Sequence, residues 1–446
     1  MARARNKLGQ FVLDRRADTI FALATARGRA GIAVIRLSGS QVYDIIRQLA
    51  GNLPSPRRAV LRDLRDSNGL VLDSALVLWF PGPHSFTGED CGELHVHGGP
   101  AVIESIFTVL GSMPGLRPAD PGEFTRRAVE AGRMDLTAAE GLADLIAAET
   151  EGQRRQALNQ MGGGLAQIYE DWRARLIRLR ALVEADIDFA DEDLGLDLTA
   201  ALMPDLTQLK AEIEAHLNDG RRGERLRDGV SVAIIGPPNV GKSSLMNALA
   251  GRDVAIVSQR AGTTRDIIEV HLNLGGVPVI LADTAGLRES DDPVEAEGVA
   301  RARARAGAAD LVVAVQIAGQ KVQHPLDHSD VMEVWSKWDE APAGWAADKG
   351  YALSVKTGAG LDAFIHGLTE RAAKLAGLGE APALTRARHR EALEQAVAAL
   401  IRVDPADAGL AAEDLRVAAD AIGRITGRID IEDVLDVVFA EFCIGK

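Results

Sequence analysis

The sequence has 446 residues, of which 64 are acidic and 50 basic, giving a formal charge of −14. This length favours about three domains, and the acidic balance argues against a broad nucleic-acid-binding surface, so any RNA contact is expected to be local or shared with a partner. Two cysteines, Cys91 and Cys443, are too few for a disulfide framework and indicate a reducing compartment. No apolar run approaches the ~18 residues of a membrane span, and the basic N-terminus lacks an apolar signal core, so we expect a cytoplasmic protein without membrane contact.

The first part of the chain mixes strand and helix patterns. Short β-like runs predict strands at 19–25, 31–38, 75–80 and 92–97, and helical stretches are predicted at 41–50 and 101–110. This mixture indicates an α+β domain. Within the last strand Glu93, His95 and His97 alternate on one face, a spacing that is compatible with zinc.

A helical region follows. Residues 137–140 (TAAE) predict a capping box, and helical spacing then continues to about residue 226 with a break at 162–164. Further helices are predicted at 200–217, 388–403, 411–426 and 431–442.

An α/β module interrupts this helical region. The simplest architecture has four segments, 1–131 (α+β), 132–228 (helical), 229–377 (α/β) and 378–446 (helical). We therefore expect a multidomain fold in which the α/β module is inserted into an all-α domain.

The module contains a phosphate-binding loop. Residues 236–243 read GPPNVGKS and follow the apolar run 230–235, a pattern typical of strand, loop and helix. The glycines let backbone N–H groups face phosphates, Lys242 reaches the β and γ oxygens, and the Ser243 hydroxyl ligates Mg²⁺. The helix that begins near Ser243 adds the positive end of its dipole. A Gly-rich turn without a ligand is the alternative, which the flanking strand and helix disfavour.

Two motifs indicate switch segments. Residues 283–286 read DTAG after an apolar strand, so Asp283 is expected to hold magnesium through water and the Gly286 N–H to contact the γ-phosphate. Residues 262–266 read GTTRD and offer Thr264 as a second magnesium ligand.

Two more motifs identify the base. Residues 336–339 read SKWD, a variant of NKxD in which Asp339 accepts hydrogen bonds from N1–H and the 2-amino group of guanine. Residues 354–357 read SVKT, with backbone suited to the guanine O6. The ordered set predicts a Ras-like P-loop GTPase, an enzyme that hydrolyses GTP.

Two positions depart from the usual GTPase pattern. Leu287 stands where a glutamine orients the attacking water in Ras-like enzymes, so another group must do this. Ser336 replaces the asparagine whose amide braces the phosphate loop, which predicts looser nucleotide binding without loss of guanine specificity.

Taken together, the chain resembles the MnmE (TrmE) family of tRNA-modifying GTPases along essentially its whole length. The most specific motifs are FTGED at 86–90, HGGP at 97–100, PGEFT at 121–125 and FCIGK at 442–446. The resemblance implies a homodimer formed by the N-terminal domain, and a heterotetramer with an FAD-dependent partner of the MnmG (GidA) type. Together they would add an aminomethyl or carboxymethylaminomethyl group to carbon 5 of the wobble uridine in certain tRNAs. The one-carbon unit would come from a 5-formyl- or 5,10-methylene-tetrahydrofolate bound by the N-terminal domain.

The resemblance also implies roles for single residues. Cys443 matches a cysteine suspected of catalysis, and Glu295 matches the glutamate that orients water. The implied folate contacts are Arg36, Glu93, Arg133 and Lys446. The implied potassium ligands, which replace an arginine finger when two GTPase domains pair, are Asn239, Ser258, Arg260 through its carbonyl, and Thr263. The implied GTP contacts are Asn239, Val240, Gly241, Lys242, Ser243, Ser244, Ser258, Gly262, Thr263, Thr264, Asp283, Thr284, Ala285, Gly286, Lys337, Asp339, Ser354, Val355 and Lys356.

A regulatory GTPase of ribosome assembly is the main alternative. Such a protein binds RNA as a switch and performs no covalent chemistry. It would need an appended RNA-binding domain, typically basic, whereas this chain is acidic and ends in CIGK.

Overall fold

The computed structural model divides the chain into two compact units. The first comprises residues 1–140 and 426–446, and the second comprises residues 141–425. The structure describes residues 3–5, 11–13, 18–188, 198–252, 254–256, 269–283, 304, 306–320, 328–379, 383–429, 435, 438, 439, 442 and 445. The domain boundaries expected at 131, 228 and 377 stay predictions.

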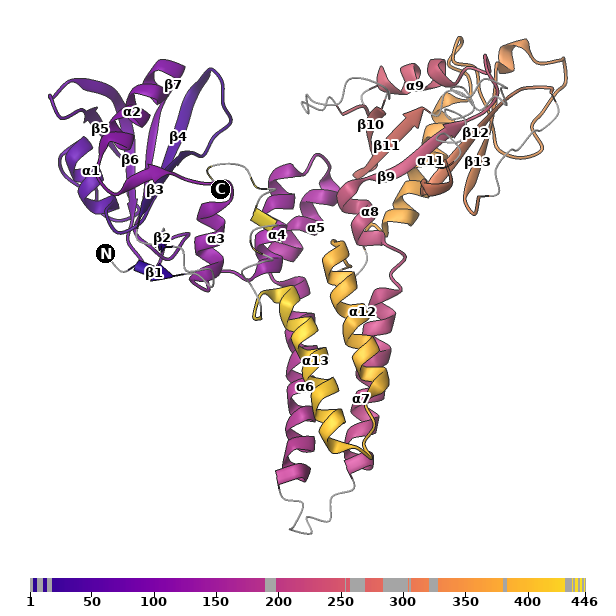
Figure 1. Ribbon diagram of the computed structural model, residues 1–446. Coiled ribbons are helices and arrows are strands. Elements are labelled where there is room, and N and C mark those ends of the chain that lie inside the picture. The colour runs from indigo at the N-terminus through magenta and orange to yellow at the C-terminus, as the bar shows by residue number, and fades with distance from the viewer. Residues whose placement is uncertain are drawn as a thin grey trace. The chain divides into compact units, whose positions relative to one another are not determined.

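The first unit is built on a six-stranded sheet (Figure 1). All neighbouring strands pair antiparallel except β3 and β8, which are parallel. The strand order across the sheet is β5 (Val60–Arg65), β6 (Val71–Phe80), β7 (Cys91–Gly98), β4 (Ala30–Ser38), β3 (Thr19–Leu23) and β8 (Leu116–Pro118). A separate two-stranded hairpin pairs β1 (Arg3–Arg5) with β2 (Phe11–Leu13).

The two faces of this sheet have different covers because side chains alternate along each strand. Helices α1 (Val42–Ala50) and α2 (Pro100–Ser112) pack on the face that carries Phe21, Ile35 and Leu37. On the opposite face, Phe124 of α3 (Glu123–Glu130) packs with Ile20 and Ala22. The opposite face also carries Arg36 and Ser38, so polar groups lie beneath α3.

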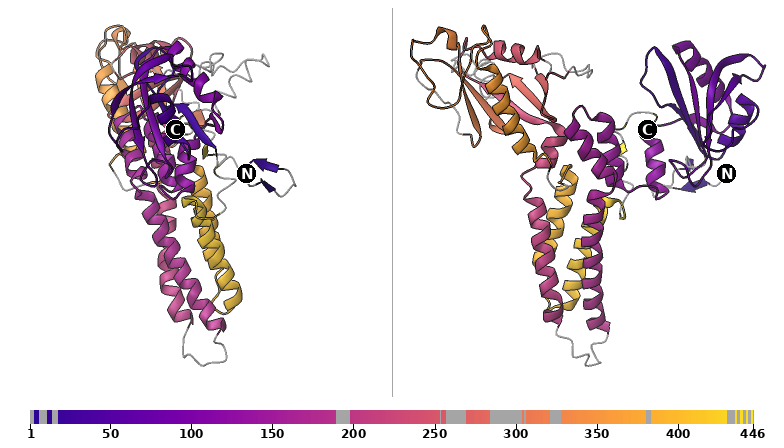
Figure 2. Two further views of the ribbon diagram at one scale, coloured as in Figure 1. Left: turned by 90° about the vertical axis from the view of Figure 1, so that its left-hand side faces the viewer. Right: turned by 180° about the vertical axis from the view of Figure 1, so that it is seen from behind.

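The second unit contains a helical bundle. Helices α6, α7, α12 and α13 run side by side in Figures 1 and 2 and share one core. The helices with their bounds are α5 (Glu151–Met161), α6 (Gly164–Asp188), α7 (Leu198–Leu217), α8 (Arg222–Asp228), α12 (Ala387–Arg402) and α13 (Ala408–Thr426). The break predicted at 162–164 is confirmed, since α5 ends and α6 begins there.

The predicted capping box at 137–140 is wrong. Helix α4 (Leu136–Ala147) begins one residue before Thr137, and the Asp135 carboxylate accepts the Ala138 N–H at 3.0 Å. Asp135 therefore occupies the cap position, and the Thr137 hydroxyl donates to it at 2.6 Å. The predicted helix 431–442 lies mostly outside the described residues.

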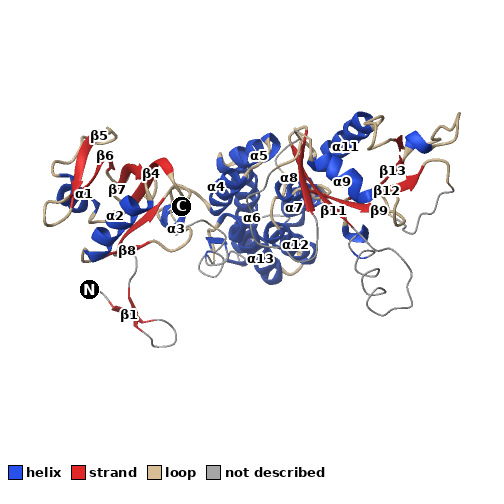
Figure 3. Cartoon of the chain, turned by 90° about the horizontal axis from the view of Figure 1, so that it is seen from above, coloured by secondary structure: helices blue, strands red, loops and turns tan. Residues whose placement is uncertain are grey.

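The remainder of the second unit is an α/β layer structure (Figure 3). Its sheet has the order β10 (Glu269–Leu274), β11 (Val277–Asp283), β9 (Val230–Ile235), β12 (Leu311–Ile317), β13 (Val331–Ser336) and β14 (Tyr351–Ala352). Only the β10–β11 pair is antiparallel. Helices α9 (Lys242–Ala250) and α11 (Leu361–Ala376) pack against its main apolar core. The predicted α+β, all-α and α/β parts are thus confirmed.

None of the described helices has the length and apolar character that crossing a bilayer requires.

Candidate functional site

The phosphate loop follows β9 at the carboxyl edge of the parallel strands, where ligands bind in open α/β sheets. Its two glycines have backbone conformations that other residues avoid, with φ of +150° at Gly236 and +99° at Gly241. A Cβ at Gly236 would also collide with the Val315 carbonyl oxygen. Around Gly241 the space is open, and this residue caps the N-terminus of α9. The loop therefore presents backbone N–H groups and a helix N-terminus to an anion.

Lys242, the charged residue of the phosphate-loop motif, contacts the loop backbone. Lys242 Nζ donates to the carbonyl oxygens of Gly236 and Pro237 at 2.8 and 3.0 Å. Asn239 adopts the left-handed conformation, with φ of +61°, and its side chain is exposed. These contacts hold the Lys242 ammonium against the backbone of the loop, beside the N-terminus of α9.

Ser336 at the end of β13 contacts the phosphate loop directly. Its hydroxyl lies 2.6 Å from the Val240 carbonyl oxygen and 2.9 Å from that of Gln316, and the residue is only 4% exposed. The amide that usually braces the loop is lost here, but the Ser336 hydroxyl contacts the same loop. A hydroxyl replaces the amide as the donor, and the looser nucleotide binding stays a prediction.

The residues predicted to read the base follow Ser336 in the chain. Asp339 is in the short 3-10 helix Trp338–Glu340, after Lys337 in the left-handed conformation. A hydrogen bond from the buried Ser354 side chain lowers the pKa of Asp339, with Lys356 and Lys337 adding attraction. An ionised carboxylate is the acceptor that the guanine N1–H and 2-amino groups require.

Several predicted site residues lie outside the described part of the chain. For Asp283, the last residue of β11, the backbone alone is described. The predicted residues outside the described ranges are Ser258, Arg260, Gly262, Thr263, Thr264, Thr284, Ala285, Gly286, Glu295, Cys443 and Lys446.

A second polar site lies on the α3 face of the N-terminal sheet. Strand register brings Arg36 of β4 opposite Glu93 of β7, and the guanidinium donates to Glu93 Oε1 at 3.0 and 3.2 Å. His95 Nε2 lies 3.1 Å from Glu93 Oε2. The Arg36 guanidinium carbon is 5.5 Å from the ring centre of Phe86 and 6.0 Å from that of Phe124. The site combines a carboxylate, a cation and two aromatic rings.

The other predicted contacts of this site lie near the same elements. Arg133 is exposed, and its side chain packs beside Gly88, whose Cβ would lie 3.6 Å from Arg133 Cγ. Near the C-terminus, Gly445 packs so closely on Leu23 at the end of β3 that a Cβ would collide with the Leu23 carbonyl oxygen.

The zinc alternative is not supported. Glu93, His95 and His97 are all described, and no group of three His, Cys, Asp or Glu side chains in the described ranges could hold a metal ion. His97 instead binds Asp73, with Nδ1 at 2.7 Å from Oδ1 and its N–H at 2.8 Å from Oδ2.

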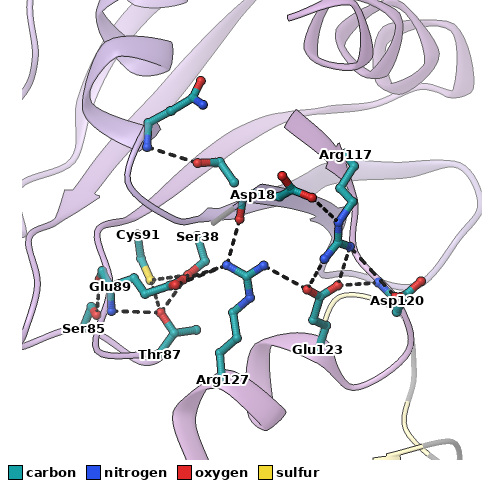
Figure 4. Close-up of polar contacts among 12 residues, drawn as sticks. Asp18, Ser38, Ser85, Thr87, Glu89, Cys91, Arg117, Asp120, Glu123 and Arg127 are labelled. Carbon is teal, nitrogen blue, oxygen red and sulfur yellow. Dashed lines mark hydrogen bonds and ion pairs between the residues drawn. The ribbon is translucent and has the colours of Figure 1, made fainter. Parts of the chain in front are cut away.

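A partly buried ion-pair network lies on the same face of the sheet, and sequence reasoning missed it. In Figure 4 the Arg127 guanidinium lies between Glu123, Glu89 and the Asp18 carbonyl. Burial opposes ionisation of Glu123, but hydrogen bonds from Arg117, the Asp120 N–H and Arg127 outweigh it and lower the Glu123 pKa. Two of the motifs, FTGED and PGEFT, supply Glu89 and Glu123. The i,i+4 spacing of Glu123 and Arg127 on a helix could have signalled that ion pair, but nothing in the sequence signals that Glu89 joins it.

Comparisons with known proteins identify the family of the chain. The family model of the GTP-binding protein TrmE N-terminus matches residues 19–133, and that of the MnmE helical domain matches residues 136–443. A protein of Parvibaculum lavamentivorans named tRNA modification GTPase MnmE is 56% identical over 442 residues, which cover 96% of this chain and 100% of that protein. One of the same name from Rhodospirillum rubrum is 53% identical over 452 residues, covering 96% and 99%. With both family models matched in order and these relatives aligned over nearly their full lengths, this chain belongs to the MnmE family of tRNA modification GTPases.

Proposed function

We propose that this protein is a potassium-dependent GTPase that modifies carbon 5 of the wobble uridine in certain tRNAs, using a tetrahydrofolate one-carbon unit and an FAD-dependent MnmG-type partner. Its GTP site is supported by the phosphate loop around Lys242 and by the ionised Asp339. Ser243, in the first turn of α9, would hold Mg²⁺ through its hydroxyl. When bound, Mg²⁺ neutralises charge on the β- and γ-phosphates.

The observation that carries the one-carbon part of the proposal is the Arg36–Glu93 pair. The Glu93 side chain is only 20% exposed, and both of its oxygens are oriented, one by Arg36 and the other by His95. A fixed carboxylate accepts two hydrogen bonds from an aminopyrimidinone edge such as that of a pterin. Phe86 and Phe124 beside the pair offer ring faces for a flat heterocycle.

Exposed apolar side chains on the same sheet support the proposed homodimer. Leu61 of the edge strand β5 pairs with Leu76 of β6, which lies opposite His95 of β7. Leu61 and Leu76 are 61% and 41% exposed, and Ile32 of β4 is 64% exposed. Exposed apolar residues on one sheet are typical of an interface, and a second copy of the domain would cover them.

Folate binding tests the proposal against the RNA-switch alternative. Equilibrium dialysis of the full-length protein with 5-formyltetrahydrofolate is expected to show binding that Glu93→Ala abolishes. Glu104→Ala is the matched control, because Glu104 is exposed on α2, which packs on the opposite face of the sheet. Absence of binding by the unaltered protein would favour the alternative.

Analysis of tRNA tests the biological role. In a strain that lacks this protein, the wobble uridine of the affected tRNAs is expected to lose its 5-substituent. Expression of the unaltered chain should restore the substituent, and expression of Glu93→Ala should not. An unchanged wobble uridine in the deletion strain would contradict the proposal.

A further inference from the structure

One turn of the N-terminal domain contacts two residues of the proposed folate site. The turn comprises residues 82–90 and connects β6 to β7. Through Phe86 it packs a ring against the Arg36 guanidinium, at 5.5 Å. Through Gly88 it packs against Arg133, and a side chain at Gly88 would also meet the Ala131 methyl at 3.1 Å. The position of this turn therefore affects where the side chains of Arg36 and Arg133 lie.

Glu89 anchors the turn to the sheet. Its Oε2 accepts a hydrogen bond from Ser38 Oγ of β4 at 2.7 Å. The Glu89 N–H donates to Thr87 Oγ1 at 3.2 Å, and the Ser85 hydroxyl donates to the Glu89 carbonyl oxygen. The turn is thus closed around Glu89, whose carboxylate attaches it to β4 together with the Thr87 hydroxyl, which lies 2.7 Å from Ser38 Oγ.

Arg127 of α3 supplies the opposite charge. Its Nη1 donates to Glu89 at 3.0 and 3.2 Å and to the Asp18 carbonyl oxygen at 3.0 Å (Figure 4). Its Nη2 donates to Glu123 at 2.9 Å, and the side chain is only 8% exposed. Glu123 is in turn held by Arg117 at 2.6 and 2.8 Å. Because these partners lie on different elements, the guanidinium has one orientation that satisfies them all.

We propose that Glu89 and Arg127 are positioning residues for the proposed folate site. Their ion pair holds the turn 82–90 against α3, so that Phe86 and Gly88 fix the side chains of Arg36 and Arg133. Neither Glu89 nor Arg127 binds the ligand itself. The inference rests on the proposed folate binding and adds the residues that shape the site.

The test uses full-length Glu89→Gln, which keeps the side-chain volume and removes the charge. Its control is Glu130→Gln, which neutralises the carboxylate that pairs with Arg126 on the same helix at 3.2 Å. For each protein three quantities are measured: affinity for 5-formyltetrahydrofolate by equilibrium dialysis, amide hydrogen exchange of peptides that span residues 82–90, and GTP hydrolysis. We expect Glu89→Gln to weaken binding by about tenfold or more, to speed exchange in the turn, and to leave GTP hydrolysis unchanged. Glu130→Gln is expected to change none of the three.

A double-variant cycle separates positioning from a general structural role. If Glu89 acts through the ring of Phe86, then Phe86→Leu and Glu89→Gln will not have additive effects on folate affinity. Arg127→Met and Glu89→Gln should likewise be non-additive, because each removes the same ion pair. Where Arg127→Met fails to fold, Ser38→Ala replaces it, since it removes the other bond to Glu89.

Three results would overturn the inference. Faster exchange in the turn with unchanged folate affinity would mean that the turn does not shape the site. Weaker affinity with unchanged exchange would mean that Glu89 contacts the ligand itself. Failure of the unaltered protein to bind folate would refute the proposed function. This result is distinguishable from the first two, because both of those require that the unaltered protein binds folate.

Discussion

The Ser336 hydroxyl lies 2.6 Å from the Val240 carbonyl oxygen and so joins the guanine-reading motif to the phosphate loop. Both residues are buried, and removing the donor leaves a buried carbonyl without it. Ser336→Ala is therefore expected to make the free energy of GTP binding less favourable by about 1 to 2 kcal/mol. This corresponds to roughly 5- to 30-fold weaker GTP binding. Fluorescent-nucleotide titration measures this.

The matched variant is Ser336→Thr, which keeps the hydroxyl. Its GTP affinity should stay within about threefold of that of the unaltered protein. The ratio of GTP to ATP affinity should be the same in all three proteins, because Asp339 still reads the base. Equal GTP affinity in Ser336→Ala would show that the loop needs no brace from this position.

Asp339 is the residue that we propose determines the base that the site accepts. Its lowered pKa, caused first by the hydrogen bond from Ser354, keeps it an anionic acceptor at neutral pH. Asp339→Asn replaces one acceptor oxygen with a donor, which suits a carbonyl at position 2 of the purine. We expect the variant to prefer xanthosine triphosphate over GTP by about tenfold or more, in a competition assay. A retained preference for GTP would contradict the assignment.

Potassium and Glu295 test the mechanism of hydrolysis. Leu287 has no polar atom with which to orient water, so the proposal needs both the ion and the carboxylate. GTP hydrolysis is expected to be much faster in potassium than in sodium, and Glu295→Ala should lower kcat about 100-fold. Glu370→Ala serves as control, because Glu370 is an exposed carboxylate on α11. Equal rates in the two salts would refute the potassium assignment.

The fold was largely predictable because its signals are local. Apolar runs before Gly236 and Asp283 predict strands, and Gly162 to Gly164 predicts the break between α5 and α6; the structure has each of these. Cap assignment failed at α4 because Asp135 and Thr137 are both good caps two residues apart.

The contacts within the sites were less predictable because they depend on strand pairing. Arg36 and Glu93 are 57 residues apart and meet only through the register of β4 with β7. Ser336 reaches Val240 across 96 residues because β13 and β9 both end at the same edge of the sheet. The resemblance indicated Arg36 and Glu93. The SKWD motif indicated that position 336 faces the phosphate loop, but not that a serine hydroxyl forms the contact.

The Glu123 network predicts a pH-dependent stability of the N-terminal domain. Because the folded-state pKa of Glu123 is lowered, its contribution is complete above the unfolded pKa and is lost as the pH falls through the folded value. Thermal unfolding of the unaltered protein and of Glu123→Gln should therefore differ most near pH 7, and the difference should shrink toward pH ~3. A difference that is constant with pH would show that Glu123 stabilises α3 by shape and not by charge.

Gly152 at the start of α5 contacts the β10–β11 turn, and this contact predicts a destabilising effect of Gly152→Ala. The Gly152 N–H donates to the Gly276 carbonyl oxygen at 2.9 Å, and a Cβ would lie 2.5 Å from that oxygen and 2.9 Å from side-chain carbons of Leu226 and Leu378. In a helix, alanine is more stable than glycine by about 0.5–1 kcal/mol. Overpacking lowers the stability of the fold by about 1–3 kcal/mol, so the clash dominates.

Gly409→Ala in α13 is the matched control, since its Cβ would meet only the Asp407 carboxylate, at 3.5 Å. Urea denaturation should show a lower midpoint for Gly152→Ala and an equal or higher one for Gly409→Ala. Because β11 ends at Asp283, displacement of its turn by alanine should also lower the rate of GTP hydrolysis. A midpoint for Gly152→Ala at or above that of the unaltered protein would mean that α5 and the turn can separate without cost, and that the hydrogen bond between them contributes nothing to stability.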